Sequence, residues 1–180
     1  MKPARDESKA TLVDFSGLYR AHAQDVRRFA LYLSGNPALA DDLVSEAFVR
    51  VWTARDRVEL TTVRAYLFAI VRNLFLKHLQ IEHRHAPLDE RAVDDQPGPE
   101  RRVRDQSDLR TVLAALAKLP EIDRAAVLMR ADEGLPYEDI AAALGISAVA
   151  AKVKVHRARL KLAEALQPVS SVAAGREKSS

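Results

Sequence analysis

The sequence predicts an all-α protein built from two small helical domains that a flexible linker joins. Apolar residues recur every three or four positions along most of the 180-residue chain, which is the spacing of amphipathic helices. Alternating apolar and polar runs and Asn-Gly turns, which indicate strands and hairpins, are almost absent. A polar stretch with three prolines, residues 86–107, separates the two helical parts and is typical of a linker.

The composition indicates a folded, soluble protein. Hydrophobic residues make up 48% of the chain and charged residues 29%, and the net charge of +3 is too small to indicate a nucleic-acid partner by itself. The absence of cysteine excludes disulfides, thiol catalysis and cysteine-based zinc sites. The first residues lack the apolar core of a signal peptide, and no apolar run reaches the roughly 20 residues that span a bilayer. We therefore expect a cytoplasmic protein without membrane insertion.

Three helices are expected in the N-terminal domain, residues 12–85. The first ends at Ser34-Gly35, and the second begins with Asn36 as N-cap and Pro37 as first helical residue. Thr61 or Thr62 caps the third helix. The apolar stripes of these helices are expected to face a shared core, and they contain Phe15, Leu18, Tyr19, Val26, Phe29, Ala30, Leu33, Leu39, Leu43, Ala47, Phe48, Val51, Trp52, Tyr66, Leu67, Ile70, Val71 and Leu74.

Helical spacing resumes at about Asp108 and defines the C-terminal domain, residues 108–167, in which four helices are expected. Pro120 ends the first of these helices and Gly134 breaks the second. The remaining residues, 168–180, are small and polar and are expected to be disordered.

Residues 135–166 carry the strongest local pattern, that of a helix-turn-helix. Gly145 stands where the chain has to turn sharply and favours a positive φ, and Ser147 is a good N-cap for the helix that follows. In that second helix one apolar seam is expected to pack on the preceding helix, and it contains Ala151, Val155, Ala158 and Leu162.

The other faces of the same helix are basic: they carry Lys152, Lys154, His156, Arg157, Arg159 and Lys161, and no acidic residue lies between the first and the last of these. A basic face alone is equally compatible with an ordinary solvated helix. The small alanines, the turn glycine, the serine cap and the one-sided charge together favour insertion into the major groove of DNA, where lysine and arginine neutralise phosphates or donate to guanine.

The whole pattern over residues 12–166 resembles the extracytoplasmic-function (ECF) group of bacterial RNA polymerase sigma factors. ADDLVSEAFVRVW (40–52) is similar to the family's polymerase-binding helix, and VRAYLFAIVRNLFLKHL (63–79) to its −10-reading segment. Residues 113–162 are similar to region 4, which reads the −35 element. The resemblance implies that core RNA polymerase and promoter DNA are partners. It also implies an anti-sigma protein, which nothing in the sequence itself indicates.

The resemblance also implies three sets of site residues. Core polymerase would be bound by Asp42, Glu46 and Arg50, which otherwise form a solvated helix face. The −10 DNA would be held by Thr61, Thr62, Arg64, Phe68, Arg72, Asn73 and Lys77, with Phe68 either stacking on a base or packing inside. The −35 DNA would be contacted by Ala150, Lys152, Val153, Lys154, His156, Arg157 and Lys161.

The start of the recognition helix departs from the family pattern. Family members usually carry a Gly-Thr-Val-Lys-Ser-Arg-Leu-like string, whereas residues 149–155 here read VAAKVKV. Lys154 replaces the arginine and cannot make its bidentate contact. Val153 either touches a thymine methyl or is merely tolerated. These departures are compatible with the family's docking mode, but they leave open which −35 sequence is preferred.

We expect a sigma factor that is not itself an enzyme and needs no cofactor or metal. Asp41 and Asp42 lack a nearby histidine, nucleophile or glycine-rich loop, and the histidines near the end of the third helix lack ligand spacing with carboxylates. Two alternatives remain. One is a stand-alone helix-turn-helix regulator, although the N-terminal half shows no heptads or ligand pocket. The other is a decoy that binds an anti-sigma protein, although such modules are fused to a receiver domain.

Overall fold

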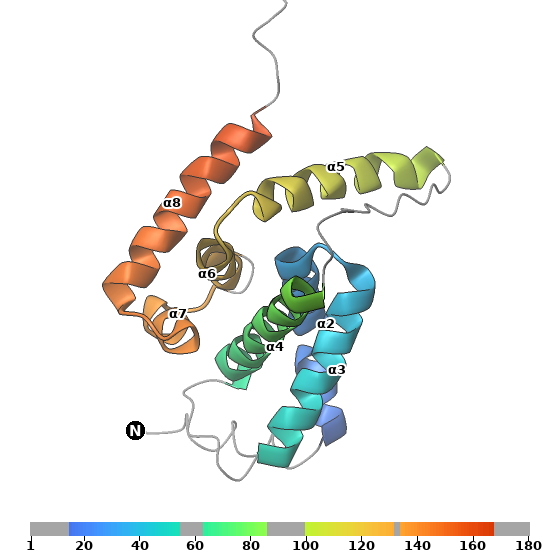
Figure 1. Cartoon of the computed structure of the whole chain (residues 1–180), viewed down its shortest axis with the longest axis vertical. Helices are drawn as coiled ribbons and strands as arrows, with labels where there is room; N and C mark the ends of the chain where they lie inside the picture. Colours follow the sequence, from blue (N-terminus) through green and yellow to red (C-terminus); the bar gives the residue numbers. More distant parts are fainter. Residues whose placement is uncertain (1–14, 55–62, 86–99, 132–133, 168–180) are drawn as a thin grey trace, which may run out of the picture.

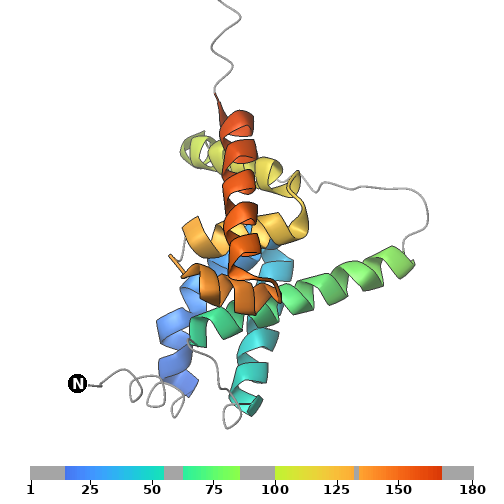
Figure 2. The ribbon, with the colours of Figure 1, turned by 90° about the vertical axis from the view of Figure 1, so that its left-hand side faces the viewer.

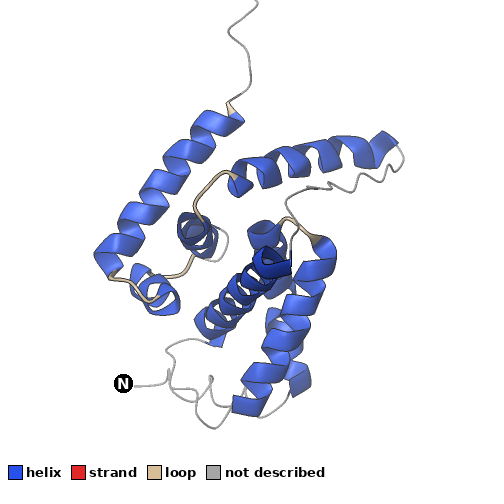
Figure 3. Ribbon diagram, viewed as in Figure 1, coloured by secondary structure: helices blue, strands red, loops and turns tan. Residues whose placement is uncertain are grey.

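The computed structural model describes residues 15–54, 63–85, 100–131 and 134–167. Every regular element in these ranges is an α-helix, which confirms the predicted all-α class (Figure 3). The two candidate caps of the third helix, Thr61 and Thr62, lie outside the described residues, as do 86–99 of the predicted linker and the whole predicted tail.

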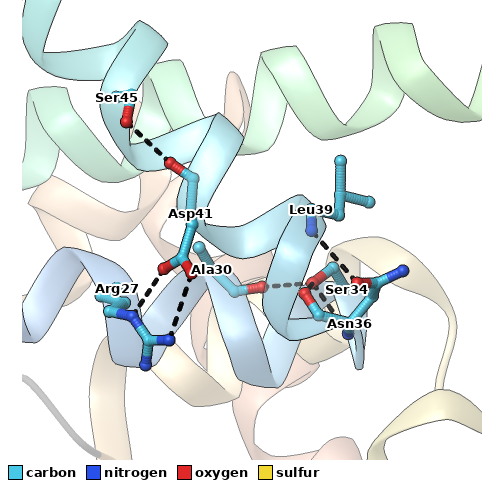
Figure 4. A network of polar contacts seen from close by, with 7 residues as sticks. All are labelled: Arg27, Ala30, Ser34, Asn36, Leu39, Asp41 and Ser45. Carbon is cyan, nitrogen blue, oxygen red and sulfur yellow. Dashed lines mark hydrogen bonds and ion pairs between the residues drawn. The ribbon is translucent and has the colours of Figure 1, made fainter.

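The N-terminal half consists of α2 (Phe15–Ser34), α3 (Pro37–Ala54) and α4 (Val63–His85), which pack against one another (Figure 1). Gly35 turns the chain between α2 and α3 with a φ of +69°. The Asn36 side-chain oxygen accepts a hydrogen bond from the Leu39 amide at 3.1 Å, so the predicted N-cap is confirmed (Figure 4). Arg27 and Asp41 then join the two helices at 2.6 Å.

Three phenylalanines form the centre of the core in this half: Phe29, Phe48 and Phe68 are all fully buried. The rings of Phe29 and Phe68 lie 4.6 Å apart between centroids. Two residues of the predicted apolar stripe, Phe15 and Tyr19, are exposed, because they lie in the first turns of α2. They pack at the edge of the core, where the Phe15 ring meets the half-buried Trp52 at 5.4 Å.

The C-terminal half consists of α5 (Glu100–Ala117), α6 (Glu121–Ala131), α7 (Tyr137–Leu144) and α8 (Ala148–Leu166). The helix α5 begins earlier than the predicted start at about Asp108, within the stretch assigned to the linker. The segment ERRVRDQS has no apolar spacing, which concealed the helix. Glutamate, arginine and glutamine nevertheless favour helical backbone, so a helix that is fixed further along extends through them.

The two halves pack against each other in this structure. Helices α5 and α6 contact α2, and α7 contacts α4, so the C-terminal half covers one side of the N-terminal half (Figure 1). The buried apolar residues of both halves form one continuous cluster. The C-terminal part of α4 projects beyond this contact (Figure 2), and its last residues are exposed. Residues on α4 near the contact are therefore covered, whereas those further along are accessible.

Candidate nucleic-acid interface

The helices α7 and α8 form the predicted helix-turn-helix. Gly145 ends α7 with a φ of +67°, and the Ile146 amide donates to the Ala141 carbonyl at 3.0 Å. Ser147 then caps α8, because its hydroxyl oxygen accepts a hydrogen bond from the Ala150 amide at 3.1 Å. The left-handed glycine and the serine cap are both confirmed, and together they fix the angle at which α8 leaves α7.

One face of α8 packs on the domain and the other faces solvent. Ala151, Val155 and Ala158 are buried against α6 and α7, as the apolar seam predicts. Ala150 is partly exposed. The outward face is exposed along most of the helix and carries Lys152, Val153, His156, Arg157, Arg159 and Lys161. A mainly cationic, exposed surface of this kind is suited by its charge to the phosphates of a DNA backbone.

Lys154 is the exception, and the expectation that it faces outward is wrong. Its side chain is only 21% exposed, and its ammonium nitrogen lies 3.4 Å from Oδ1 of Asp123 in α6. Arg157 also approaches this carboxylate, with Nε 3.0 Å from Oδ2, while half of its side chain stays exposed. The carboxylate draws Lys154 inward because a buried negative charge needs cationic partners.

Sequence reasoning missed Asp123, although a signal for it was present. In the α6 sequence EIDRAAVLMRA, Asp123 lies on the same side as Ala126 and Val127, both of which are buried. An acidic residue on the buried side of a helix predicts a cationic partner on whatever element packs there. The sequence alone did not show that the partner element is α8.

On α4, Asn73 and Lys77 are exposed, and their contact with the −10 DNA stays a prediction. Arg72, one position before Asn73, is engaged by the other half of the protein. Its Nε and Nη2 atoms donate to the two carboxylate oxygens of Glu121 at 2.7 and 2.8 Å. Only 12% of the Arg72 side chain and 19% of the Glu121 side chain are exposed. In this arrangement Arg72 is not available to a phosphate.

Two other residues predicted for the −10 element have structural partners. Phe68 is fully buried against Phe29, so the interpretation that it stacks on a base is wrong and packing is correct. Arg64 is partly exposed and binds Asp25 of α2 at 2.8 Å. Burial lowers the pKa of the nearby His22, and Arg64 adds to this effect while Asp25 opposes it.

Beside this network, Glu121 has a second arginine neighbour at the contact between the two halves. Arg124 donates from Nη1 to the Leu33 carbonyl at the end of α2. Burial lowers the pKa of Arg124, and Glu121 opposes that shift. One glutamate therefore lies between two partly buried arginines at the junction.

The three residues predicted to bind core polymerase share the solvent face of α3. Asp42, Glu46 and Arg50 are all exposed, and Arg50 pairs with Glu46 across one turn at 2.6 Å. Val49, between them in sequence, is also exposed. A surface that combines charges with an accessible aliphatic side chain is suitable for binding another protein.

Neither a metal centre nor a membrane segment stands out in the part of the chain that the structure describes. No three histidine or acidic side chains there gather closely enough to hold a metal ion. The described helices are also not long and apolar enough to cross a bilayer. On α3, α4 and α8 the structure presents charged and polar side chains to solvent.

Family models match both halves of the chain. Residues 18–85 match the family model "Sigma-70 region 2", and residues 109–162 match "Sigma-70, region 4". The ECF RNA polymerase sigma factor SigE of Mycolicibacterium smegmatis is 35% identical over 168 residues, which cover 91% of this chain but 65% of that protein. The ECF RNA polymerase sigma factor EcfG of Rhodopseudomonas palustris is 34% identical and covers 81% of each chain.

Solved structures give the same result for the fold. The sigma factor RpoE in complex with the anti-sigma factor NepR from Bartonella quintana superposes with a TM-score of 0.69 at 29% identity. That match covers 85% of this chain and 96% of RpoE. The structure of CnrH in complex with the cytosolic domain of CnrY gives a TM-score of 0.66 over 90% of this chain and 96% of that one, and at 24% identity it supports the fold alone.

Proposed function

The chain belongs to the ECF group of RNA polymerase sigma factors, and from this membership we propose how its helices serve transcription initiation. It binds core RNA polymerase and directs it to promoters. Residues 12–85 bind polymerase and the −10 element, residues 108–167 bind the −35 element, and residues 86–107 connect the two. A connection of roughly 20 residues spans tens of ångströms when it is extended, so the two parts reach separate promoter elements.

The outward face of α8 carries the proposal for the −35 element. Because α8 is capped and anchored through its apolar seam, the helix that carries the exposed cations is held in a fixed position on the domain. In the groove, Lys152 and Lys161 neutralise phosphates and Arg157 donates to a base edge or a phosphate. Ala150, Val153 and His156 complete the contact surface, whereas Lys154 takes no part because Asp123 holds it inside.

On α4, Asn73 and Lys77 hold the −10 DNA directly. The amide of Asn73 donates and accepts hydrogen bonds at a base edge, and Lys77 neutralises a phosphate. Arg72 joins them only after the two halves separate and Glu121 releases it. The docked arrangement of the two halves is then a form of the protein that is not engaged with the −10 element.

On α3, Asp42, Glu46 and Arg50 provide the polymerase-binding surface. The polymerase forms the RNA, so this chain performs no catalysis of its own and needs no cofactor. Transcription takes place in the cytoplasm, where we place the protein. An anti-sigma protein is a further proposed partner, by analogy with the anti-sigma complex of the similar RpoE.

Reconstitution with core RNA polymerase tests this function. The full chain is mixed with core enzyme, analysed by gel filtration, and used in transcription from templates whose start sites have been mapped after overexpression. Co-elution and transcripts that begin at the mapped sites are expected. A chain that elutes apart from core enzyme and binds promoter duplex by itself would instead be a stand-alone regulator.

A pair of variants connects co-elution to α3. Asp42→Arg reverses a charge on the proposed polymerase-binding surface and is expected to weaken binding to core enzyme about tenfold, or about 1.4 kcal/mol. Asp108→Arg makes the same change at an exposed position of α5 and is expected to leave binding unchanged. Equal effects of both variants would show that net charge rather than the α3 surface determines binding.

A further inference from the structure

Among the residues that the structure describes, Asp123 is the charged side chain that is buried, and it lies directly beneath α8. Its side chain is 1% exposed, and it belongs to the first turn of α6, which packs closely on α8. Its two oxygens face Lys154 and Arg157, which lie one turn apart on α8. One carboxylate therefore contacts two cations that belong to the helix proposed to read DNA.

Stability alone does not require a carboxylate at this position, although the first turn of a helix favours negative charge. The neighbouring Ala125, Ala126 and Val127 are buried and apolar, and an apolar residue of similar size in place of Asp123 would avoid the cost of removing a charge from water. The ion pairs offset that cost but do not generally exceed it. The carboxylate is better explained by its effect on the two cations.

The effect on the two cations differs. Lys154 is drawn in until little of it is exposed, so its charge is neutralised on the inner side of α8. Arg157 is contacted at Nε, and half of its side chain remains in solvent. Oδ2 of Asp123 accepts no hydrogen bond from the described residues, so its contact with Arg157 is one of charge rather than of directed bonding.

We propose that Asp123 is a positioning residue for promoter recognition. It attracts the guanidinium of Arg157 and so reduces the number of orientations in which that group enters the groove, and it withdraws Lys154 from the phosphates. The first effect favours the correct sequence, since a preorganised arginine loses less freedom when it binds a base edge. The second effect lowers the affinity for DNA of any sequence, because one lysine fewer is available to displace counterions from the phosphates. This inference rests on the proposed binding of the −35 element by α8.

Asp123→Asn is the most direct perturbation, because it keeps the shape of the side chain and removes the charge. The variant is expected to lose several-fold in discrimination between selected and scrambled −35 sequences. Its affinity for scrambled duplex is expected to rise, and the slope of log affinity against log salt to steepen by about 0.9, because Lys154 is released toward the phosphates. A purely structural role predicts the opposite for scrambled DNA, since an unfolded domain binds every duplex less well.

The measurements use holoenzyme reconstituted from the full chain and core RNA polymerase. Duplexes with a randomised −35 segment are selected with the wild type, and the selected and scrambled duplexes then serve as probes over a salt series. Glu164→Gln is the matched control, because it removes the same charge from an exposed position near the end of α8. This control is expected to retain wild-type discrimination.

Lys154→Met distinguishes the effect of Lys154 from that of Arg157, and it keeps the inference testable if Asp123→Asn does not fold. It leaves Asp123 in contact with Arg157, so wild-type discrimination and an unchanged salt slope are expected, although a lysine has been removed from the recognition helix. A double-mutant cycle provides the last test: on an Arg157→Ala background, Asp123→Asn is expected to have no further effect on discrimination.

Three results would overturn the inference. They are wild-type discrimination in Asp123→Asn, a salt slope that Lys154→Met lowers by about 0.9, and additive effects in the cycle. Failure of the wild-type holoenzyme to select any −35 sequence is a different result. It would refute the proposed function of α8 and the role of Asp123 along with it.

Discussion

Replacing Glu121 with glutamine is expected to loosen the contact between the two halves of the molecule. In the wild type, both carboxylate oxygens of Glu121 accept hydrogen bonds from Arg72, at 2.7 and 2.8 Å. The same carboxylate also opposes the lowering of the Arg124 pKa. The amide of glutamine has one acceptor oxygen and no charge, so Arg72 loses its paired contact and Arg124 loses a compensating negative charge.

The size of the effect follows from the burial of the pair. Removing one partner of a buried ion pair costs about 3–5 kcal/mol. Because 12% of Arg72 and 19% of Glu121 remain exposed, water recovers part of this cost, and about 2 kcal/mol is expected. This corresponds to an increase of about thirtyfold in the ratio of undocked to docked molecules.

Single-molecule energy transfer measures this ratio in the full chain. The sequence contains no cysteine, so Val49→Cys on α3 and Leu160→Cys on α8, both exposed positions, accept two fluorophores without competing sites. Glu121→Gln is expected to shift molecules from the high-transfer to the low-transfer population. The double variant that carries both Arg72→Glu and Glu121→Arg is expected to restore the docked population, because it recreates the ion pair with the two charges swapped.

Glu46→Gln is the control, since among the described residues its carboxylate pairs with Arg50 of the same helix. Its transfer histogram is expected to match that of the wild type. The reasoning would be refuted if Glu121→Gln left the histogram unchanged, or if the control shifted it equally.

Three further predictions concern stability. Phe68→Ala removes a fully buried ring and is expected to destabilise the chain by about 3–5 kcal/mol in denaturant unfolding, whereas a base-stacking role would leave stability almost unchanged. Ser147→Ala removes the N-cap of α8 and is expected to cost about 1 kcal/mol in the same assay, with Ser147→Asn retaining most of the stability. The pKa of His22 lies below its ordinary value of 6.5, so the folded state binds fewer protons than the unfolded state near that pH. The free energy of unfolding is then highest above about pH 6.5 and decreases as the pH falls through the lowered pKa of the folded state. Denaturant unfolding measured at several pH values is expected to show a smaller decrease in His22→Gln.

Local features of the fold were predictable because their causes lie within a few residues. Asn36, Gly145 and Ser147 act on backbone groups of their own turn, so the residue type and its position were sufficient to place them. The buried seam of α8 followed from periodicity for the same reason. The start of α5 was missed because a polar helix has no apolar period to reveal it.

The orientation of individual site residues was less predictable, since it depends on neighbours that are distant in sequence. Lys154 is turned inward by Asp123, Arg72 is engaged by Glu121, and Phe68 is covered by Phe29. Periodicity assigns a residue to a side of its helix but does not identify what packs there. The resemblance to a family indicated which helices act, and the tertiary structure was needed to show which of their side chains are accessible.

The salt dependence of promoter binding tests most directly whether the outward cations of α8 contact DNA. Holoenzyme that carries Lys152→Ala together with Lys161→Ala is compared with wild type and with Lys118→Ala, an exposed lysine outside α8, on one promoter duplex. The slope of log affinity against log salt is expected to become shallower by about 1.8 in the double variant and to stay unchanged in the control. An unchanged slope in the double variant would contradict the account.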